Sequence, residues 1–219
     1  MEKKRILVIL SGCGVKDGSE IQESVLTLLA LDRAGAETLC AAPNIMSTLC
    51  VDHFRGTKTN ETRNVLTESA RIARGHIIPL SQIELDQIDG IILPGGLGAA
   101  CNLSDFAYTQ DQITIEPELQ KLLLAAHQKG KPLGFICIAP VIAATLFGAE
   151  GIRYTLGNDQ ELATRFAKNG AEHINCSPSE AVTDEKLKIV TTPAFMLAES
   201  LAEAEPGITQ LVNEVLKLA

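Results

Sequence analysis

The expected fold rests on one short stretch near the middle of the chain, Gly134-Phe135-Ile136-Cys137-Ile138-Ala139-Pro140. Its apolar residues predict a buried strand over 133–136, and Pro140 suits the first turn of a helix that begins at about residue 139. A strand that passes into a helix at a small nucleophilic residue is the arrangement of a nucleophile elbow. We therefore expect Cys137 at the carboxyl end of a strand and the amino end of a helix.

Strand and helix patterns alternate on both sides of this stretch, and short links join them. We expect strands over 5–10, 37–42, 88–93, 133–136 and 152–156, helices over 20–34, 61–74, 117–128 and 160–168, hairpins near 55–58 and 181–192, and a C-terminal helix in which Pro206 marks a break or restart. This alternation predicts an α/β fold: a flavodoxin-like, doubly wound, mostly parallel sheet with helices on both faces. No linker or repeat interrupts it, so we expect a single domain over 1–219.

The composition excludes several classes of protein. The chain has 219 residues, of which 46% are hydrophobic and 21% charged, an ordinary globular mixture. A formal net charge of −8 argues against a nucleic-acid or anionic-membrane partner, because both need a basic surface. No run of about 18 apolar residues is present. The apolar stretch 6–10 is too short for a signal peptide, so we expect it to form the first strand.

The cysteines and histidines indicate reduced thiols and no metal site. Six cysteines are scattered without a CxxC pair, which favours a reducing, cytoplasmic location. The four histidines are far apart and lack ligand spacing, so we expect no structural zinc.

In an open parallel sheet, ligands bind outside the carboxyl ends of the strands, and two side chains are candidates for chemistry there. Cys137 is the candidate nucleophile, with a buried core cysteine as the alternative. Glu20 opens the first helix at the same edge, and a protonated carboxyl there would donate a hydrogen bond to the sulfur of a low-pKa thiol. The alternative for Glu20 is an acid favoured in the first turn of a helix.

Two glycine-rich loops lie at this edge. Pro94-Gly95-Gly96-Leu97-Gly98 follows an apolar strand, and its backbone N–H groups would approach a ligand closely enough to form an oxyanion hole. The loop 12–18 superficially suggests a nucleotide site, but its third glycine falls one residue late for GxGxxG and no Gly-Lys-Ser/Thr follows. We therefore reject a dinucleotide site.

With these segments in place, the chain resembles the ThiJ/PfpI superfamily of the class I glutamine amidotransferase-like fold. More narrowly, it is similar to ElbB-type proteins, described as glyoxalases or as isoprenoid biosynthesis-associated proteins. The resemblance covers essentially the whole chain and is carried by residues 10–15 with 17–20, 61–66, 94–100 with Asn102 and Leu103, 134–140 and 191–194.

The resemblance implies a cofactor-independent glyoxalase that converts glyoxal or methylglyoxal, a small aldehyde substrate, into a 2-hydroxy acid. In that chemistry Cys137 adds to the aldehyde and Glu20 moves a proton between the two carbons. Backbone N–H groups around Gly95, Gly96 and Ile138 would stabilise the oxyanion. The resemblance also implies a homodimer. The link to isoprenoid metabolism comes from the family name alone.

The chain departs from the superfamily at two points. Many members place His directly after the nucleophile, where this chain has Ile138. A glutaminase needs a late His-x-Glu, and the segment around 192–194 has none. We therefore expect neither a His-assisted protease nor a glutaminase.

Five further residues are candidates for the pocket: Cys13, Arg63, Asn64, Asn102 and His173. Cys13 precedes Glu20 and would resolve an oxidised Cys137. Arg63 and Asn64 belong to a stretch that simpler superfamily members lack, and a solvated helix start explains them equally well. A lone histidine such as His173 is more often structural.

A redox-sensing or ligand-binding protein is the alternative function. The same thiol would then be oxidised to sulfenic or sulfinic acid, with the carboxyl stabilising the product. Turnover separates the two functions, because an enzyme regenerates its thiol and a sensor consumes it.

Overall fold

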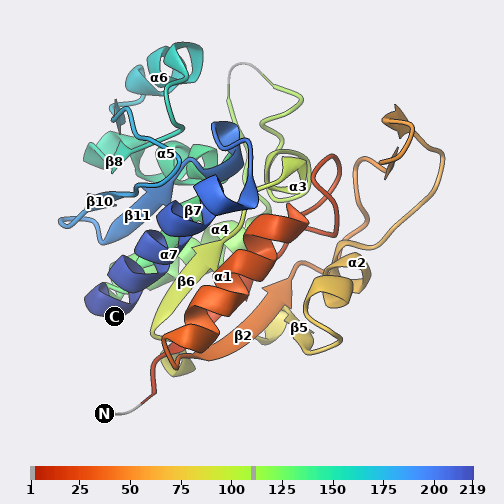
Figure 1. The fold of residues 1–219 in the computed structure, drawn as a ribbon, viewed down its shortest axis with the longest axis horizontal. Helices are drawn as coiled ribbons and strands as arrows, with labels where there is room; N and C mark the ends of the chain where they lie inside the picture. Colours follow the sequence, from red (N-terminus) through yellow and green to blue (C-terminus); the bar gives the residue numbers. More distant parts are fainter. Residues whose placement is uncertain (1–2, 110–111) are drawn as a thin grey trace.

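A seven-stranded sheet runs through the centre of the computed structural model, which describes residues 3–109 and 112–219 (Figure 1). The strand order is β10-β11-β7-β6-β1-β2-β5, and β10 is the antiparallel edge strand of an otherwise parallel sheet. The strands are β1 (Arg5–Ile9), β2 (Glu37–Ala42), β5 (Ile77–Pro79), β6 (Gly90–Leu93), β7 (Leu133–Ile136), β10 (Val182–Asp184) and β11 (Ile189–Thr192).

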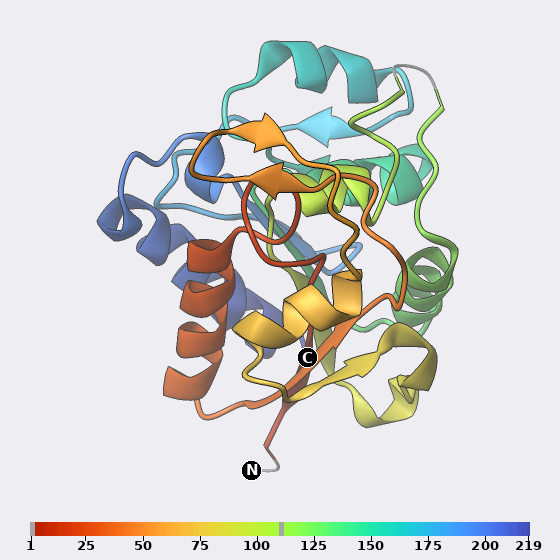
Figure 2. The same ribbon diagram turned by 90° about the vertical axis from the view of Figure 1, so that its right-hand side faces the viewer.

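Helices cover both faces of the sheet (Figures 1 and 2). One face carries α1 (Ile21–Arg33), α2 (Val65–Ile72) and α7 (Leu201–Leu218), and the other carries α4 (Pro117–Gln128) and α5 (Pro140–Phe147). Alternate side chains of each strand enter opposite cores: Leu7 and Ile9 pack with α4 and α5, whereas Ile6 and Val8 pack with α1 and α7. Central strands are therefore apolar on both sides, which explains their uninterrupted hydrophobic runs.

Several smaller elements lie outside the main sheet. They are the antiparallel pair β3 (Val51–Asp52) and β4 (Thr57–Lys58), the parallel pair β8 (Arg153–Tyr154) and β9 (Glu172–His173), α3 (Leu97–Cys101), α6 (Gln160–Ala167) and the short 3-10 helices η1 (Leu80–Gln82), η2 (Leu85–Gln87), η3 (Gly148–Glu150) and η4 (Ala194–Met196). Among the described helices, none is both long enough and apolar enough to cross a membrane.

The predicted α/β fold class is confirmed, and the differences are local. The strand expected over 152–156 is only β8, which pairs with β9 outside the main sheet. Hydrophobic periodicity does not predict β5, β9 and α3, because two to five residues are too few to show a period. Glu20 is the N-cap of the first helix and not its first residue.

The expected break at Pro206 is wrong, because α7 runs continuously from Leu201 to Leu218 with Pro206 inside it. Proline in a helix interior removes one backbone hydrogen bond and crowds the carbonyl four residues earlier. The apolar face of α7 packs against the sheet through Ile208, Leu211 and Val212, all fully buried. That burial holds the helix together across the proline.

Replacing Pro206 with alanine is expected to raise the free energy of unfolding by about 1–3 kcal/mol, because it restores a hydrogen bond to Ala202 at an exposed position. Urea unfolding followed by circular dichroism measures the change. The matched control is Pro117→Ala at the first turn of α4, where the N–H is not used and no gain is expected. Equal stability of Pro206→Ala and the wild type would contradict the prediction.

Candidate active site

Cys137 lies on the predicted elbow between β7 and α5. Its φ of 62° puts a residue other than glycine in the left-handed region, which is a strained conformation. The backbone N–H of Cys137 donates to the carbonyl of Thr192 at the end of β11, over 2.9 Å, and holds the turn. The side chain is 9% exposed. The nucleophile elbow expected from residues 134–140 is therefore the geometry that the chain adopts.

Gly95 makes a close approach possible beneath the cysteine. A Cβ at this position would lie 2.4 Å from Cys137 Cβ and 2.7 Å from Glu23 Oε2. No larger residue fits without moving one of these side chains. The glycine brings the end of β6, the elbow and helix α1 into contact.

Glu23 is the carboxyl beside the cysteine. It is fully buried and forms a side-chain hydrogen bond with Cys137. Oε2 accepts from the N–H of Gly95 at 2.9 Å, and Oε1 accepts from the N–H of Phe195 at 3.3 Å. Phe195 reaches it because Ala194, with a φ of 41°, turns the chain sharply after β11. Three segments distant in sequence thus converge on one carboxyl group.

The surroundings of Glu23 favour its protonated form. Burial, together with the nearby carboxylate of Glu20, raises the pKa of Glu23 to about 8, although hydrogen bonds from Cys137, Phe195 and Gly95 oppose the rise. Near neutral pH the carboxyl is therefore mostly protonated and can donate to the sulfur. A minority remains ionised and can accept a proton.

The thiol of Cys137 is not the low-pKa group that the sequence suggested. Burial raises the pKa of the Cys137 thiol, and an ionised Glu23 raises it further. The backbone N–H groups of Gly96 and Ile138 donate to the sulfur and lower the pKa. Near neutral pH most molecules carry a protonated Glu23. Only the minority in which Glu23 is ionised repel a thiolate at Cys137. The two groups therefore titrate as a coupled pair.

The expectation that Glu20 is the proton partner of Cys137 is corrected by this geometry. Glu20 caps α1: its Oε2 accepts from the N–H of Glu23 at 2.6 Å. Its own N–H donates to the carbonyl of Gly95 at 2.9 Å, and the N–H of Gly95 donates to Glu23. Glu20, Gly95 and Glu23 thus form a closed ring of hydrogen bonds. Glu20 holds the carboxyl that meets the sulfur instead of meeting it itself.

Of the two glycines of the loop 94–98 that were expected to supply oxyanion donors, Gly96 directs its N–H at the sulfur and Gly95 does not. The N–H groups of Gly96 and Ile138 face the sulfur, where the oxyanion donors were predicted. The N–H of Gly95 is bonded to Glu23, so it is not available as a donor to substrate. Gly96 has a φ of 94°, and a side chain there would collide with the backbone of Gly18 and Glu20. The loop therefore serves the site through close packing as well as through donors.

Three of the candidate pocket residues lie together, around a cavity next to the β1–α1 loop. Cys13, Arg63 and Asn102 line this small space with Asp17 and Glu68. Burial raises the pKa of the Cys13 thiol, which does not favour a reactive thiolate. The lining of the cavity does not include Cys137.

Asn102 holds loops together. Its amide nitrogen donates to the carbonyls of Ser11 and Asp17 at 2.9 and 3.0 Å, and its oxygen accepts from the N–H of Thr48 at 3.1 Å. Arg63 forms ion pairs with Glu61 and Asp17. These contacts position the loops around the cavity.

Asn64 and His173 have structural roles. Asn64 is the half-buried N-cap of α2 and accepts from the N–H of Thr67, so the start of a helix explains it. His173 lies in β9, where Nε2 accepts from the N–H of Leu156 and the ring packs edge-on against Tyr154. Burial lowers the pKa of His173, which keeps the imidazole neutral as that contact requires.

The sequence carries a signal for Glu23. It falls on the same face of α1 as Thr27, Ala30 and Leu31, four, seven and eight residues later, and all four are buried. An acidic residue on the apolar face of a helix, one turn from its amino end, needs a partner.

Among the described residues, no cluster of three or more His, Cys, Asp or Glu side chains could hold a metal ion.

Comparison with known proteins shows relatives over nearly the whole chain. The chain is 42% identical to "Glutamine amidotransferase-like class 1 domain-containing protein 3, mitochondrial" from Homo sapiens, covering 98% of this chain and 83% of that protein. It is 41% identical to "ES1 protein homolog, mitochondrial" from Rattus norvegicus, covering 99% of this chain and 84% of that protein. No family model matches the chain.

Solved structures agree with the fold. An isoprenoid biosynthesis protein with an amidotransferase-like domain from Ehrlichia chaffeensis superposes with a TM-score of 0.91 and 34% identity, over 98% of this chain and 100% of that chain. Drosophila melanogaster DJ-1beta superposes with a TM-score of 0.58 and 20% identity, over 100% of this chain and 96% of that chain, a likeness of fold alone.

The stability of the protein is expected to fall as pH rises through the range in which Glu23 ionises. Its pKa of about 8 in the folded state lies above the ordinary 4.5, so the folded state holds an extra proton between these values. The contribution, up to about 5 kcal/mol, is complete below pH 4.5 and lost by about pH 8. Urea unfolding at intervals of pH measures the decline. Glu23→Gln should remove it, whereas the exposed control Glu118→Gln should keep it.

Glu20→Gln is expected to lower the pKa of Glu23 while leaving the fold intact. The amide oxygen can still accept from the N–H of Glu23, so the loss of stability should stay below about 1 kcal/mol. Removing the charge removes one of the causes that raise the pKa of Glu23. The midpoint of the pH-dependent decline should therefore move to lower pH. An unchanged midpoint would show that Glu20 has no electrostatic effect on the pair.

Proposed function

The chain belongs to the family of glutamine amidotransferase-like class 1 domain proteins that includes the ES1 proteins, and on that basis we propose that it is a cofactor-independent glyoxalase-type enzyme. Its substrate would be glyoxal or methylglyoxal and its product the corresponding 2-hydroxy acid. One observation carries the proposal: a buried carboxyl of raised pKa is hydrogen-bonded to a cysteine on a strained elbow, with two backbone N–H groups directed at the sulfur.

The first step is addition of the Cys137 sulfur to the aldehyde carbon. The ionised fraction of Glu23 takes the thiol proton as the carbon–sulfur bond forms, and the proton passes to the aldehyde oxygen to give a hemithioacetal. The N–H groups of Gly96 and Ile138 stabilise the oxygen while it is negatively charged. Glu23 is ionised again at the end of the step.

The second step moves hydrogen from one carbon to the other. Glu23 removes the proton from the former aldehyde carbon, an enediol-like state forms, and Glu23 returns the proton to the neighbouring carbon. The result is a thioester of a 2-hydroxy acid on Cys137. Water hydrolyses it and regenerates the thiol. One carbon is oxidised and its neighbour reduced, so no external oxidant is needed.

The departures from the hydrolase patterns bear on the reaction class. The residue after the nucleophile is Ile138, and the segment beyond β11 supplies the backbone of Phe195 to Glu23 in place of a His-x-Glu pair. A carboxyl alone thus serves as the proton carrier. This arrangement suits proton transfer between adjacent carbons and lacks the histidine that a His-assisted amidase uses.

The location that we propose is a reducing compartment. All six cysteines are free thiols. The cytoplasm meets this condition, and the mitochondrion is the alternative because the human and rat relatives are named as mitochondrial proteins.

Formation of hydroxy acid from glyoxal or methylglyoxal is the decisive assay. The wild-type enzyme should form glycolate or lactate over many turnovers, with kcat/KM rising with pH through about 8 as Glu23 ionises. Cys137→Ala should abolish turnover, and Cys176→Ala, which removes a half-buried cysteine outside the site, should not. Glu23→Gln should lower kcat at least about 100-fold, whereas Glu20→Gln should lower it by less than about 10-fold.

The same assay tests the redox-sensing alternative. Loss of the Cys137 thiol under peroxide, with no hydroxy acid from either aldehyde, would overturn the glyoxalase proposal and favour a sensor. Equal losses from Glu23→Gln and Glu20→Gln would overturn the assignment of Glu23 as the proton carrier.

A further inference from the structure

One segment of four residues is attached to both members of the buried pair. This segment, residues 192–195, leaves the end of β11 and enters η4. At its first residue, the carbonyl of Thr192 accepts from the N–H of Cys137 at 2.9 Å. At its last residue, the N–H of Phe195 donates to Glu23 Oε1 at 3.3 Å. The conformation of the segment therefore contributes to the position of the carboxyl relative to the elbow.

Ala194, the last residue of the sequence motif 191–194, has an unusual backbone conformation. Among the described residues, four other than glycine have a positive φ: Arg74, Cys137, Lys188 and Ala194. Cys137 and Ala194 are the two that are buried. A residue with a side chain keeps such a conformation only where the surrounding structure enforces it, and such residues are frequent at functional sites. Both buried cases lie at the candidate active site.

Contacts on both sides of Ala194 enforce the turn. Its side chain is fully buried in the same apolar cluster as the residues of α7. Its carbonyl accepts from the N–H groups of Leu197 and Ala198 at 3.1 and 2.9 Å. Thr192 is held separately, because its Oγ1 donates to the carbonyl of Glu180 at 2.7 Å. Both ends of the segment are thus fixed by contacts outside the buried pair.

The two backbone donors to Glu23 come from different segments and bond different oxygens. Gly95, after the end of β6, donates to Oε2, and Phe195 donates to Oε1. A carboxyl with one donor can rotate about the bond to its side chain, whereas donors on both oxygens fix its plane. Proton transfer requires the two heavy atoms to lie within hydrogen-bond distance at a suitable angle, so this orientation bears on the reaction.

We propose that residues 192–195 are a positioning element for proton transfer and that Ala194 is the positioning residue within it. The strained turn at Ala194 directs the N–H of Phe195 to Oε1 and keeps the carboxyl of Glu23 oriented toward the sulfur of Cys137. Ala194 acts through Phe195 and takes no part in the bond changes. The inference rests on the proposed function, because the reaction needs a proton to pass between sulfur, substrate and carboxyl.

Ala194→Gly tests the turn, because glycine adopts a positive φ without strain and many other conformations as well. The contact of Phe195 with Glu23 should therefore loosen while the fold is kept. We expect kcat for hydroxy-acid formation to fall at least about 10-fold and KM to change less than about 2-fold, because a misdirected carboxyl affects the bound substrate and not its binding. The matched control is Arg74→Gly, which relieves the same strain at an exposed residue outside the site and should leave kcat unchanged.

Replacing the amide of Phe195 by an ester removes the N–H and keeps the side chain. Cell-free synthesis with phenyllactic acid on a suppressor tRNA makes this change. Glutamate labelled at its carboxyl carbon lets NMR follow the ionisation of Glu23 in the resting protein, and Glu23→Gln identifies the signal. Because the N–H of Phe195 lowers the pKa of Glu23, its loss should raise that pKa of about 8 by about half a pH unit or more. Ala194→Gly should shift the pKa in the same direction, opposite to Glu20→Gln.

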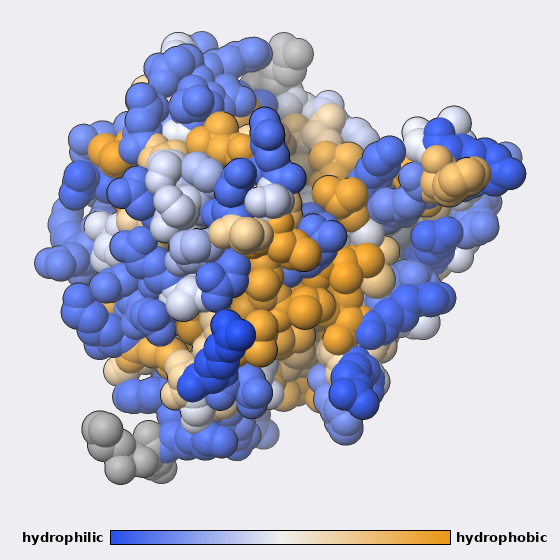
Figure 3. Space-filling view, in the orientation of Figure 1, coloured by the Kyte–Doolittle hydropathy of each residue, from blue (hydrophilic) through white to orange (hydrophobic). Residues whose placement is uncertain are grey.

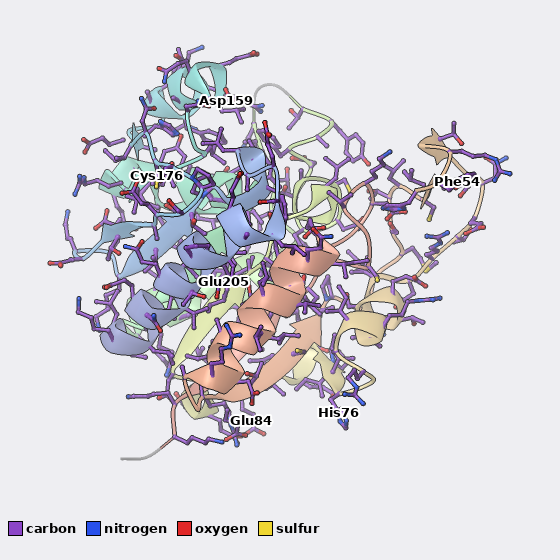
Figure 4. All side chains as sticks on the ribbon, viewed as in Figure 1. Phe54, His76, Glu84, Asp159, Cys176 and Glu205 are labelled. Atoms are coloured by element: carbon purple, nitrogen blue, oxygen red, sulfur yellow. The ribbon has the colours of Figure 1, made fainter. Side chains whose placement is uncertain are left out.

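Phe54 provides the matched control for the ester. Its N–H donates to Asp52 Oδ1 at 3.0 Å in the turn between β3 and β4. This turn belongs to a mostly hydrophilic projection from the body (Figure 3), and Phe54 lies at its outer end (Figure 4). Phe54 is 95% exposed, so the same ester at this position should leave kcat and the pKa of Glu23 unchanged.

Circular dichroism of each protein separates misfolding from these effects. Wild-type kcat in Ala194→Gly and in the Phe195 ester would overturn the proposal. A fall in kcat with an unchanged pKa of Glu23 would also overturn it, because a merely structural disturbance produces that result. If the wild type forms no hydroxy acid while the pKa of Glu23 shifts as expected, the proposed reaction fails and the orientation of the carboxyl by residues 192–195 is supported.

Discussion

The absence of a side chain at Gly95 is the constraint on which the site depends. The end of β6 passes so close to the elbow that a methyl group there would overlap Cys137 and Glu23. The backbone of Gly95 also forms two hydrogen bonds. Its carbonyl accepts from the N–H of Glu20, and its N–H donates to the carboxyl of Glu23. The central sheet, the first helix and the turn at Cys137 are thereby joined through one peptide unit. A displacement of any of the three would alter the distance between carboxyl and sulfur.

Burial then decides the protonation of the pair. A carboxyl and a thiol removed from water both resist ionisation, so the pair keeps its protons near neutral pH. The sequence suggested a reactive cysteine already present as a low-pKa thiolate. The structure instead describes a protonated cysteine beside a carboxyl whose raised pKa of about 8 suits repeated gain and loss of a proton. The sulfur would become nucleophilic as its proton leaves.

The loops at the carboxyl edge of the sheet and the outer side of helix α1 differ in the contacts that they make. The carboxyl edge of the sheet brings together the loops that hold the site, and Asn102 fastens two of them through buried hydrogen bonds. The outer face of α1 has no such contacts and remains apolar. One helix thus carries Glu23, which contacts Cys137, on its buried side and exposes Ile21, Val25 and Leu29 to solvent on the other.

The sequence by itself determined the elements and their chemistry. Apolar runs, helix stops and the strand-to-helix turn at Cys137 are local features, and local sterics and periodicity are enough to place them. Only the tertiary structure decided which carboxyl meets the sulfur. Glu20 and Glu23 are three residues apart, and the rotation of α1 against the sheet, set by packing of Thr27, Ala30 and Leu31, turns one inward and leaves the other as a cap. That rotation depends on contacts between segments as distant as α1 and η4, which no local pattern contains.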